Sequence, residues 1–376
     1  MSRHITRALF AATAGIALTT SGLAGASAAG AAPTSPAGPA ASFTISGGFS
    51  GVAVTSARSA WAVGAVGDGS GEKTLIAHWS GTTWKLVRSP RPAGGGFLDG
   101  VAATSAGSAG AVGGTQPATG RGEMLIVHWN GSAWKQVRSP VLAGGHLTGV
   151  AAVSGRLAWA VGNTYPGIGR YKDLILRWNG TSWKQVPSPT PAGGPALLGV
   201  AAVSARSAWA VGVIGGNPYR TLILHWNGIA WKRVPSPSPG SASNDVLYGV
   251  AATSARNAWA VGTMDYSKSL ILHWNGKTWK QAHSPSPAGR TSLTLRSVTA
   301  TSARNAWAAG YSNGKTLIER WNGITWKQVP SPSPASDSYL FGVAAASARN
   351  VWAAGATYHN GRPRTLIMHW NGTAWK

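Results

Sequence analysis

The chain has 376 residues, of which 33 are Lys or Arg and 9 are Asp or Glu, so its formal net charge at pH 7 is +24. It contains 51 Gly, 22 Pro and 20 Trp, and it has no Cys. The lack of Cys excludes a disulfide scaffold, a zinc-thiolate site, an iron–sulfur cluster and a cysteine nucleophile. With 44% hydrophobic residues, the chain has enough apolar side chains to form a folded core.

The first 31 residues have the features of a secretory signal peptide. Arg3 and Arg7 precede an Ala-rich apolar run, and small residues suited to cleavage follow at Ala26 and Ala28. The alternative, a membrane anchor, is disfavoured because Thr and Ser interrupt the apolar run at residues 19–21. We therefore expect a secreted, extracellular bacterial protein, exported by the general secretory route because its two arginines are not adjacent.

Residues 32–48 are rich in Pro, Ala and Gly and are predicted to form a linker. No later segment is long and apolar enough to suggest a membrane span. Residues 49–376 are expected to form one repetitive domain.

The domain contains seven repeats of 45 to 50 residues, which start near residues 51, 100, 149, 199, 249, 297 and 342. Each repeat begins with a small-residue segment such as Gly-Val-Ala-Ala-Thr-Ser, continues with Ala-Trp-Ala-Val-Gly and ends with Leu-Ile-Leu-His-Trp-Asn-Gly and Trp-Lys. Every Trp occupies one of three repeat positions, and Gly110 stands where the second repeat lacks one.

The spacing within each repeat predicts four short strands. In the fifth repeat, residues 248–254 and a segment ending at Gly262 are predicted to form the first two. Residues 270–274 precede Asn275-Gly276, a strong signal for a two-residue hairpin turn. That turn would place Trp274 opposite Lys277, and it would gather Leu270, Leu272, Trp274 and Trp279 on one apolar face.

Four antiparallel strands repeated seven times predict an all-β fold, a seven-bladed β-propeller. The small residues of the first strand suit the crowded centre of the ring, and tryptophans would fill the wider gaps between blades. An open solenoid is the alternative, but solenoids usually need polar capping repeats, which the sequence lacks. Ser35-Pro36 resembles the end of a repeat, so we expect the N-terminal segment to close the ring.

The order Trp-Ala-Val-Gly, then Leu-Ile, then Asn-Gly-Thr-x-Trp-Lys resembles the bacterial-neuraminidase repeat (BNR, Asp-box) propellers, in particular the photosystem II stability and assembly factor type. Hairpins such as Asn179-Gly180 to Trp183 and Asn371-Gly372 to Trp375 carry the resemblance. Asn replaces the Asp of that family, so the turn is only similar to an Asp-box. The resemblance implies the fold, and a fold does not determine a function.

Catalytic and metal sites find little support in the sequence, and we predict no catalytic residue, cofactor or metal. The nine carboxylates are scattered over different repeats, whereas glycoside hydrolysis needs a positioned pair. Five of the nine His occupy one repeat position, where two other repeats have Arg, and this indicates a structural role. These five are His78, His128, His225, His273 and His369.

The positive charge follows the symmetry of the repeats. A Lys follows the last Trp of every repeat, and an Arg occupies the first turn of six repeats. A nucleic-acid-binding protein normally concentrates its charge in one patch, so we expect no sequence-specific nucleic-acid partner. The charge instead predicts salt-sensitive affinity for anionic polymers such as those of a cell wall.

The loops between the second and third strands of each repeat vary most in length and sequence, and variable loops on a rigid scaffold usually carry binding. Tyr and polar residues in these loops are the predicted ligand-binding residues: Tyr165, Tyr171, Tyr219, Tyr266, Tyr311, Tyr358, His359, Arg220 and Arg364. We therefore predict a secreted, monomeric, non-catalytic module that binds an extracellular glycan, an anionic wall polymer or a protein. The alternative is an exported glycan hydrolase or lyase with acids at the channel mouth.

Overall fold

The computed structural model describes residues 43–67, 71–116, 122–140, 142, 144–167, 170–189, 191, 193–239, 244–285 and 292–376. The predicted signal peptide and most of the predicted linker lie outside these residues, as does Ser35-Pro36. No helix in the described part of the chain has the length and apolarity to cross a membrane.

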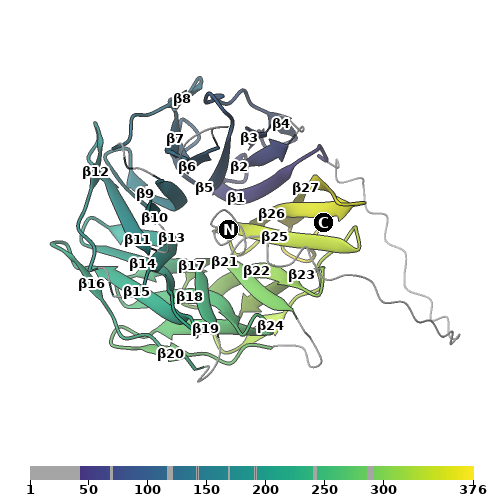
Figure 1. Ribbon diagram of the computed structural model, residues 1–376. Coiled ribbons are helices and arrows are strands. Elements are labelled where there is room, and N and C mark those ends of the chain that lie inside the picture. The colour runs from purple at the N-terminus through teal and green to yellow at the C-terminus, as the bar shows by residue number, and fades with distance from the viewer. Residues whose placement is uncertain are drawn as a thin grey trace, which may run out of the picture.

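Seven small antiparallel sheets are arranged in a ring, so the predicted seven-bladed β-propeller is confirmed (Figure 1). The strands of blades 1 to 4 are β1 (Gly48–Ser56), β2 (Ser59–Gly67), β3 (Glu72–Trp79) and β4 (Trp84–Leu86); β5 (Gly96–Ser105), β6 (Ser108–Thr115), β7 (Met124–Trp129) and β8 (Trp134–Gln136); β9 (His146–Ser154), β10 (Leu157–Gly167), β11 (Arg170–Trp178) and β12 (Trp183–Gln185); and β13 (Pro195–Ser204), β14 (Ser207–Ile214), β15 (Arg220–Trp226) and β16 (Trp231–Arg233). Those of blades 5 to 7 are β17 (Asp245–Ser254), β18 (Asn257–Met264), β19 (Lys268–Trp274) and β20 (Trp279–Gln281); β21 (Leu293–Ser302), β22 (Asn305–Ser312), β23 (Lys315–Trp321) and β24 (Trp326–Gln328); and β25 (Asp337–Ser347), β26 (Asn350–His359) and β27 (Arg362–Trp370).

The first strand of each blade lies innermost, and the seven first strands contact one another around the ring. Where these strands approach one another, six of them have Gly at one repeat position and the sixth blade has Ser297. A Cβ atom added to Gly100 would lie 3.1 Å from the Cα atom of Gly149, and one added to Gly51 would lie 3.4 Å from the Cα atom of Gly100. A larger residue there would force neighbouring backbones apart, which explains the small residues of the first strand.

Tryptophans from neighbouring blades pack into cages of three in the outer half of the ring. The second-strand Trp of one blade lies against the third-strand and outermost-strand Trp of the next, as Trp259 does at 4.9 Å from Trp321 and 5.1 Å from Trp326. Six such cages form, centred on Trp61, Trp159, Trp209, Trp259, Trp307 and Trp352. These central indoles are at most 4% exposed, so each cage buries a large apolar area.

The predicted two-residue turn after the third strand is wrong. Trp274 pairs with Trp279, so Asn275 to Thr278 form a four-residue loop. The Asn275 side chain closes this loop, because its Oδ1 atom accepts the backbone N–H groups of Lys277 and Thr278 at 3.0 Å. The predicted apolar face survives, because the register differs by two residues and side chains alternate with a period of two.

The Asn-Gly signal does form two-residue turns elsewhere. Asn313 and Gly314 connect β22 to β23, Asn360 and Gly361 connect β26 to β27, and all four residues have positive φ. A type I′ turn requires positive φ at both central residues. In contrast, Asn275 is not among the residues of positive φ, and only Gly276 has this conformation in its loop.

Blade 7 receives part of its edge from the N-terminal side of the domain. Ser46 forms a β-bridge with Arg364, and the backbone N–H of Thr365 donates to the carbonyl of Ile45 at 2.9 Å. Near the other end of β27, Trp370 forms a bridge with Trp375. Residues 43–47, which the sequence places in the linker, therefore help to close the ring between blades 7 and 1.

Candidate binding face

The ring has two faces that are built from different connections. The first turns and the loops after the third strands share one face, where the Trp274 indole N–H donates to the carbonyl of Ala255 at 3.0 Å. We call it the repeated face. The loops between the second and third strands lie at the opposite ends of the strands, together with the links between blades, and we call that side the variable face.

Backbone hydrogen bonds fix the loops of the variable face to the neighbouring blade. The N–H of Asp245 donates to the carbonyl of Tyr219 at 3.1 Å, and the N–H of Leu293 donates to the carbonyl of Tyr266 at 2.7 Å. Each bond joins a loop of one blade to the start of the innermost strand of the next. The loops therefore hold their side chains on a rigid frame.

The structure brings several of the predicted tyrosines together on blades 5 to 7. Tyr311 and Tyr358 both contact Tyr339, with ring centroids 4.8 and 5.7 Å apart. Tyr266 is half-buried, and burial raises the pKa of its hydroxyl. The phenols of Tyr219 and Tyr311 add to this rise in pKa, and the charge of Arg296 opposes it.

The remaining predicted residues do not contact this group through ring packing. Tyr165 and Tyr171 pack against each other on blade 3 with ring centroids 5.2 Å apart. Arg220 and His359 are exposed, at the start of β15 and the end of β26. Arg364 is also exposed, on β27 beside the N-terminal segment.

The innermost strands add a second layer that the sequence analysis missed. The Arg296 guanidinium lies 4.2 Å from the ring centroid of Tyr248 and 5.8 Å from that of Phe341. Tyr248 and Arg296 are each 8% exposed, and Phe341 is half-buried and stacks on Tyr339 at 6.4 Å. We call Tyr248, Tyr266, Arg296, Tyr311, Tyr339, Phe341 and Tyr358 the aromatic cluster.

One repeat position would have revealed this layer. The residue before the Gly or Ser that opens each repeat is different in all seven repeats, although its neighbours are nearly constant. In chain order these residues are Ser50, Asp99, Thr148, Leu198, Tyr248, Arg296 and Phe341. Such variation within a repeated strand indicates positions that the fold leaves free.

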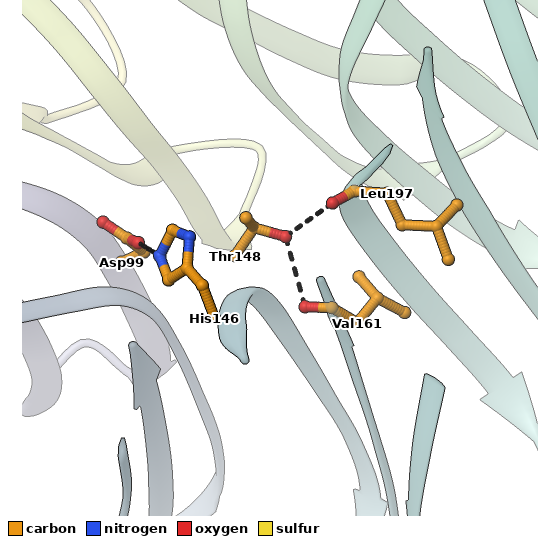
Figure 2. A network of polar contacts seen from close by, with 5 residues as sticks. All are labelled: Asp99, His146, Thr148, Val161 and Leu197. Atoms are coloured by element: carbon orange, nitrogen blue, oxygen red, sulfur yellow. Dashed lines mark hydrogen bonds and ion pairs between the residues drawn. The ribbon is translucent and has the colours of Figure 1, made fainter. Parts of the chain in front are cut away.

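On blades 2 and 3 the same layer is polar (Figure 2). His146 Nε2 lies 2.5 Å from Asp99 Oδ2, and both side chains are 14% exposed. The Phe97 ring packs edge-on against His146 with centroids 5.2 Å apart. Thr148 donates to the carbonyls of Leu197 and Val161, at 2.8 and 3.1 Å, and so links blade 3 to blade 4.

The repeated His position lies among the Trp cages. The imidazole of His273 stacks on Trp259 at 4.1 Å, and its Nε2 atom lies 2.8 Å from Asn257 Oδ1. Burial lowers the pKa of His273, so the ring is neutral at pH 7. Within the part of the chain that the structure describes, no three His, Asp or Glu side chains gather as metal ligands would.

The aromatic cluster is a surface of uncharged aromatic rings with one buried cation, the guanidinium of Arg296. Burial raises the pKa of Tyr339 and Tyr358, and Asp337 raises both further, so the two hydroxyls stay protonated at neutral pH. Tyr339 donates to Asp337 Oδ1 at 3.1 Å. Flat rings with hydroxyl donors can stack on a ligand and bond to its oxygen atoms.

Comparison with known proteins identifies the fold. No protein-family model matches the sequence, and no curated protein matches it. Among solved structures, YCF48 bound to a D1 peptide matches with a TM-score of 0.55 and 15% identity, over 86% of this chain and 95% of the other. YCF48 from Cyanidioschyzon merolae matches with a TM-score of 0.54 and 15% identity, over 85% and 96%. The structural neighbours of this chain thus include YCF48 propellers, and at this identity the likeness is one of fold.

Proposed function

We propose that the protein is a secreted binding module that recognises an extracellular glycan, a wall polymer or a protein through its variable face. The observation that carries this proposal is the aromatic cluster. Five of its rings are tyrosines from blades 5 to 7, and the guanidinium of Arg296 lies against the rings of Tyr248 and Phe341. Tyr248 and Tyr311 are buried, and Tyr266, Tyr339 and Tyr358 are partly exposed.

The backbone of Tyr266 supports a functional role. Its φ is 55°, in the left-handed region, where the corresponding turns of blades 6 and 7 have Gly. A residue with a side chain costs about 1 to 2 kcal/mol more than Gly in this conformation. A strained Tyr at the tip of a loop indicates that its ring is retained for something other than stability.

The chemistry of the cluster favours a ligand that stacks on its aromatic rings and is oriented by hydrogen bonds to its polar groups. The protonated tyrosine hydroxyls suit sugar hydroxyls or peptide carbonyls, and Arg296 suits an anionic group. The net charge of +24 adds a general attraction to anionic polymers, which salt weakens. A shaped site and a charged surface therefore make different contributions, and these can be separated experimentally.

A propeller of this type can accept a peptide, since one similar structure is YCF48 bound to a D1 peptide. This supports a protein segment as one class of ligand. The alternative function, an exported glycan hydrolase or lyase, needs a pair of acids at the site. Asp337 contacts the cluster through Tyr339. Of the other acidic residues on the innermost strands, Asp99 of blade 2 is paired with His146 of blade 3, and Asp245 of blade 5 is fully buried.

Export by residues 1–31, a monomeric state and the Asp-box-like character of the hairpins belong to the same proposal. The signal-like sequence supports export. The Asn residues that close the four-residue loops support the likeness to an Asp-box, because an Asp carboxylate could accept the same backbone N–H groups.

The test is binding of the purified protein to a panel of neutral glycans, anionic wall polymers and peptides, at low and high salt. The variants are Tyr339→Ala and Tyr266→Gly on the variable face, with Lys277→Ala in a loop of the repeated face as the control. We expect saturable binding that survives high salt and weakens in both Tyr variants. Binding to polyanions alone, lost on adding salt and equal in all variants, would show that charge accounts for it.

A further inference from the structure

The interface between blades 2 and 3 lacks the centre of its Trp cage. Trp178 and Trp183 of blade 3 pack together with ring centroids 5.7 Å apart, like the corresponding pairs in the other blades. Gly110 of blade 2 stands where the other six blades carry the central Trp. Every Trp of the chain already occupies a repeat position, so this chain has no further indole to offer.

The neighbours of Gly110 leave room for a ring. A Cβ atom added to Gly110 would have only the carbonyl oxygen of Val127 nearby, at 4.0 Å. Ala158, which would lie beneath the missing ring, is 7% exposed, whereas the corresponding residues of the other blades are 0 to 3% exposed. Trp183 is half-buried, whereas the other six outermost-strand tryptophans are buried at 2 to 9%.

The His that packs against the central Trp in other blades has no such Trp in blade 2. The rings of His78, His225, His273 and His369 each pack against the central Trp of their own blade, with centroids 4.1 to 4.3 Å apart. His128 holds the same position in blade 2, pairs with Gly110 across the ladder, and is exposed. We call Gly110, His128, Ala158, Trp178 and Trp183 the open cage.

We infer that the open cage is a binding site for a flat apolar aromatic ring of about the size of indole, supplied by another molecule. The six complete cages show how such a ring would lie. It would tilt against Trp178, meet Trp183 edge-on and pack against His128, as the central Trp does with the corresponding residues elsewhere. Aromatic pairs in these arrangements attract one another beyond the effect of buried area.

The complete cages also predict what the site does not require. All six central indole N–H groups are buried without a hydrogen-bond partner in the described structure. The cage therefore recognises shape and π surface, and it supplies no acceptor for the N–H. We expect N-methylindole to bind at least as well as indole, because it has no N–H to desolvate.

The open cage is separate from the proposed ligand site. Trp178 donates its indole N–H to the carbonyl of Gly155 at 3.0 Å, in the first turn of blade 3. That turn belongs to the repeated face, whereas the aromatic cluster belongs to the variable face of blades 5 to 7. The two sites can therefore be occupied and removed independently.

The test is ligand-observed NMR and thermal unfolding of the purified protein with indole and with N-methylindole. Gly110→Trp fills the cage from within the chain, and Gly110 accepts a side chain because its φ lies outside the left-handed region. Gly110→Ala keeps the ring space open, and Tyr339→Ala removes part of the aromatic cluster. Should Gly110→Trp fail to fold, Gly110→Phe provides a smaller filling ring.

We expect saturable binding of both compounds and a rise in melting temperature in the original protein, Gly110→Ala and Tyr339→Ala. Gly110→Trp should melt at a higher temperature without ligand, and its affinity for both compounds should fall by at least about tenfold. Equal binding after Gly110→Trp or Gly110→Phe would overturn the inference, as would no saturable binding to the original protein. Binding of simple sugars in place of indole would also overturn it.

Discussion

The repeated and variable faces are made by opposite ends of the same strands, yet they differ in what their residues do. On the repeated face, nearly constant side chains satisfy the fold: Asn275 closes its loop, and Arg256 covers Gly276. On the variable face, the corresponding positions differ from blade to blade, and they bring tyrosines into contact with one another and with Arg296. The comparison teaches that in a repeat protein the positions that deviate from the repeat are those most free to take on function.

The Trp cages should produce the largest stability effect. Removing Trp279 from a complete cage, as Trp279→Ala, should cost about 3 to 5 kcal/mol of unfolding free energy. The matched change in the open cage, Trp183→Ala, should cost clearly less, because that indole is already half-buried and lacks its central partner. Denaturant unfolding measures both, and equal losses would show that the cages do not act as units.

Glu319 is a deviation from the repeat that affects stability instead of binding. It is fully buried between blades 5 and 6, where blades 4 and 5 have Leu224 and Leu272, and Ser284 donates to it at 3.1 Å. Burial raises the pKa of its carboxyl to about 7 from the ordinary value of 4.5, and the hydrogen bond from Ser284 opposes this rise.

Because the folded pKa is higher than the unfolded pKa, ionisation of Glu319 costs stability. The cost is absent below about pH 4.5, grows as the pH rises, and is complete above about pH 7, at roughly 3 kcal/mol. Glu319→Gln should remove this pH dependence and stabilise the protein at pH 8 relative to the original chain. If the unfolding free energies of the two proteins changed by the same amount from pH 5 to pH 8, this assignment would be contradicted.

The loops of the repeated face should show a smaller effect. Asn275→Ala removes the acceptor of two backbone N–H groups and should cost about 1 kcal/mol. Asn275→Asp keeps an acceptor at the same place, and its melting temperature should stay close to that of the original protein. A loss as large in Asn275→Asp as in Asn275→Ala would mean that side-chain capping does not hold this loop.

The variable face should show the smallest effect on stability and the largest on binding. Tyr266→Gly relieves a left-handed backbone and should raise the unfolding free energy by up to about 1 kcal/mol, while it weakens ligand binding. Thermal unfolding and binding of the same sample test this opposition. A variant that is both destabilised and unimpaired in binding would assign Tyr266 to the fold.

The sequence periodicity was sufficient to predict the fold. The strand pattern recurs in seven repeats, so an ambiguous segment in one repeat is resolved by the others, and the Trp spacing identifies the strands. It failed at Asn275, since Asn-Gly is compatible with two loop lengths, and only the φ of the Asn distinguishes them. The loop tyrosines were identifiable by their position. Arg296 and Tyr248 lie on the innermost strands of neighbouring blades, and their contact is a tertiary property that the strand pattern does not predict.

The most direct test of the two-face account is hydrogen–deuterium exchange with and without a bound ligand from the panel. The account predicts increased protection at residues 245–249, 264–268, 311–317, 337–341 and 357–364, which carry the variable face of blades 5 to 7. The loops of the repeated face, such as residues 275–278, should exchange at the same rate in both states. Protection confined to the repeated face would contradict the account.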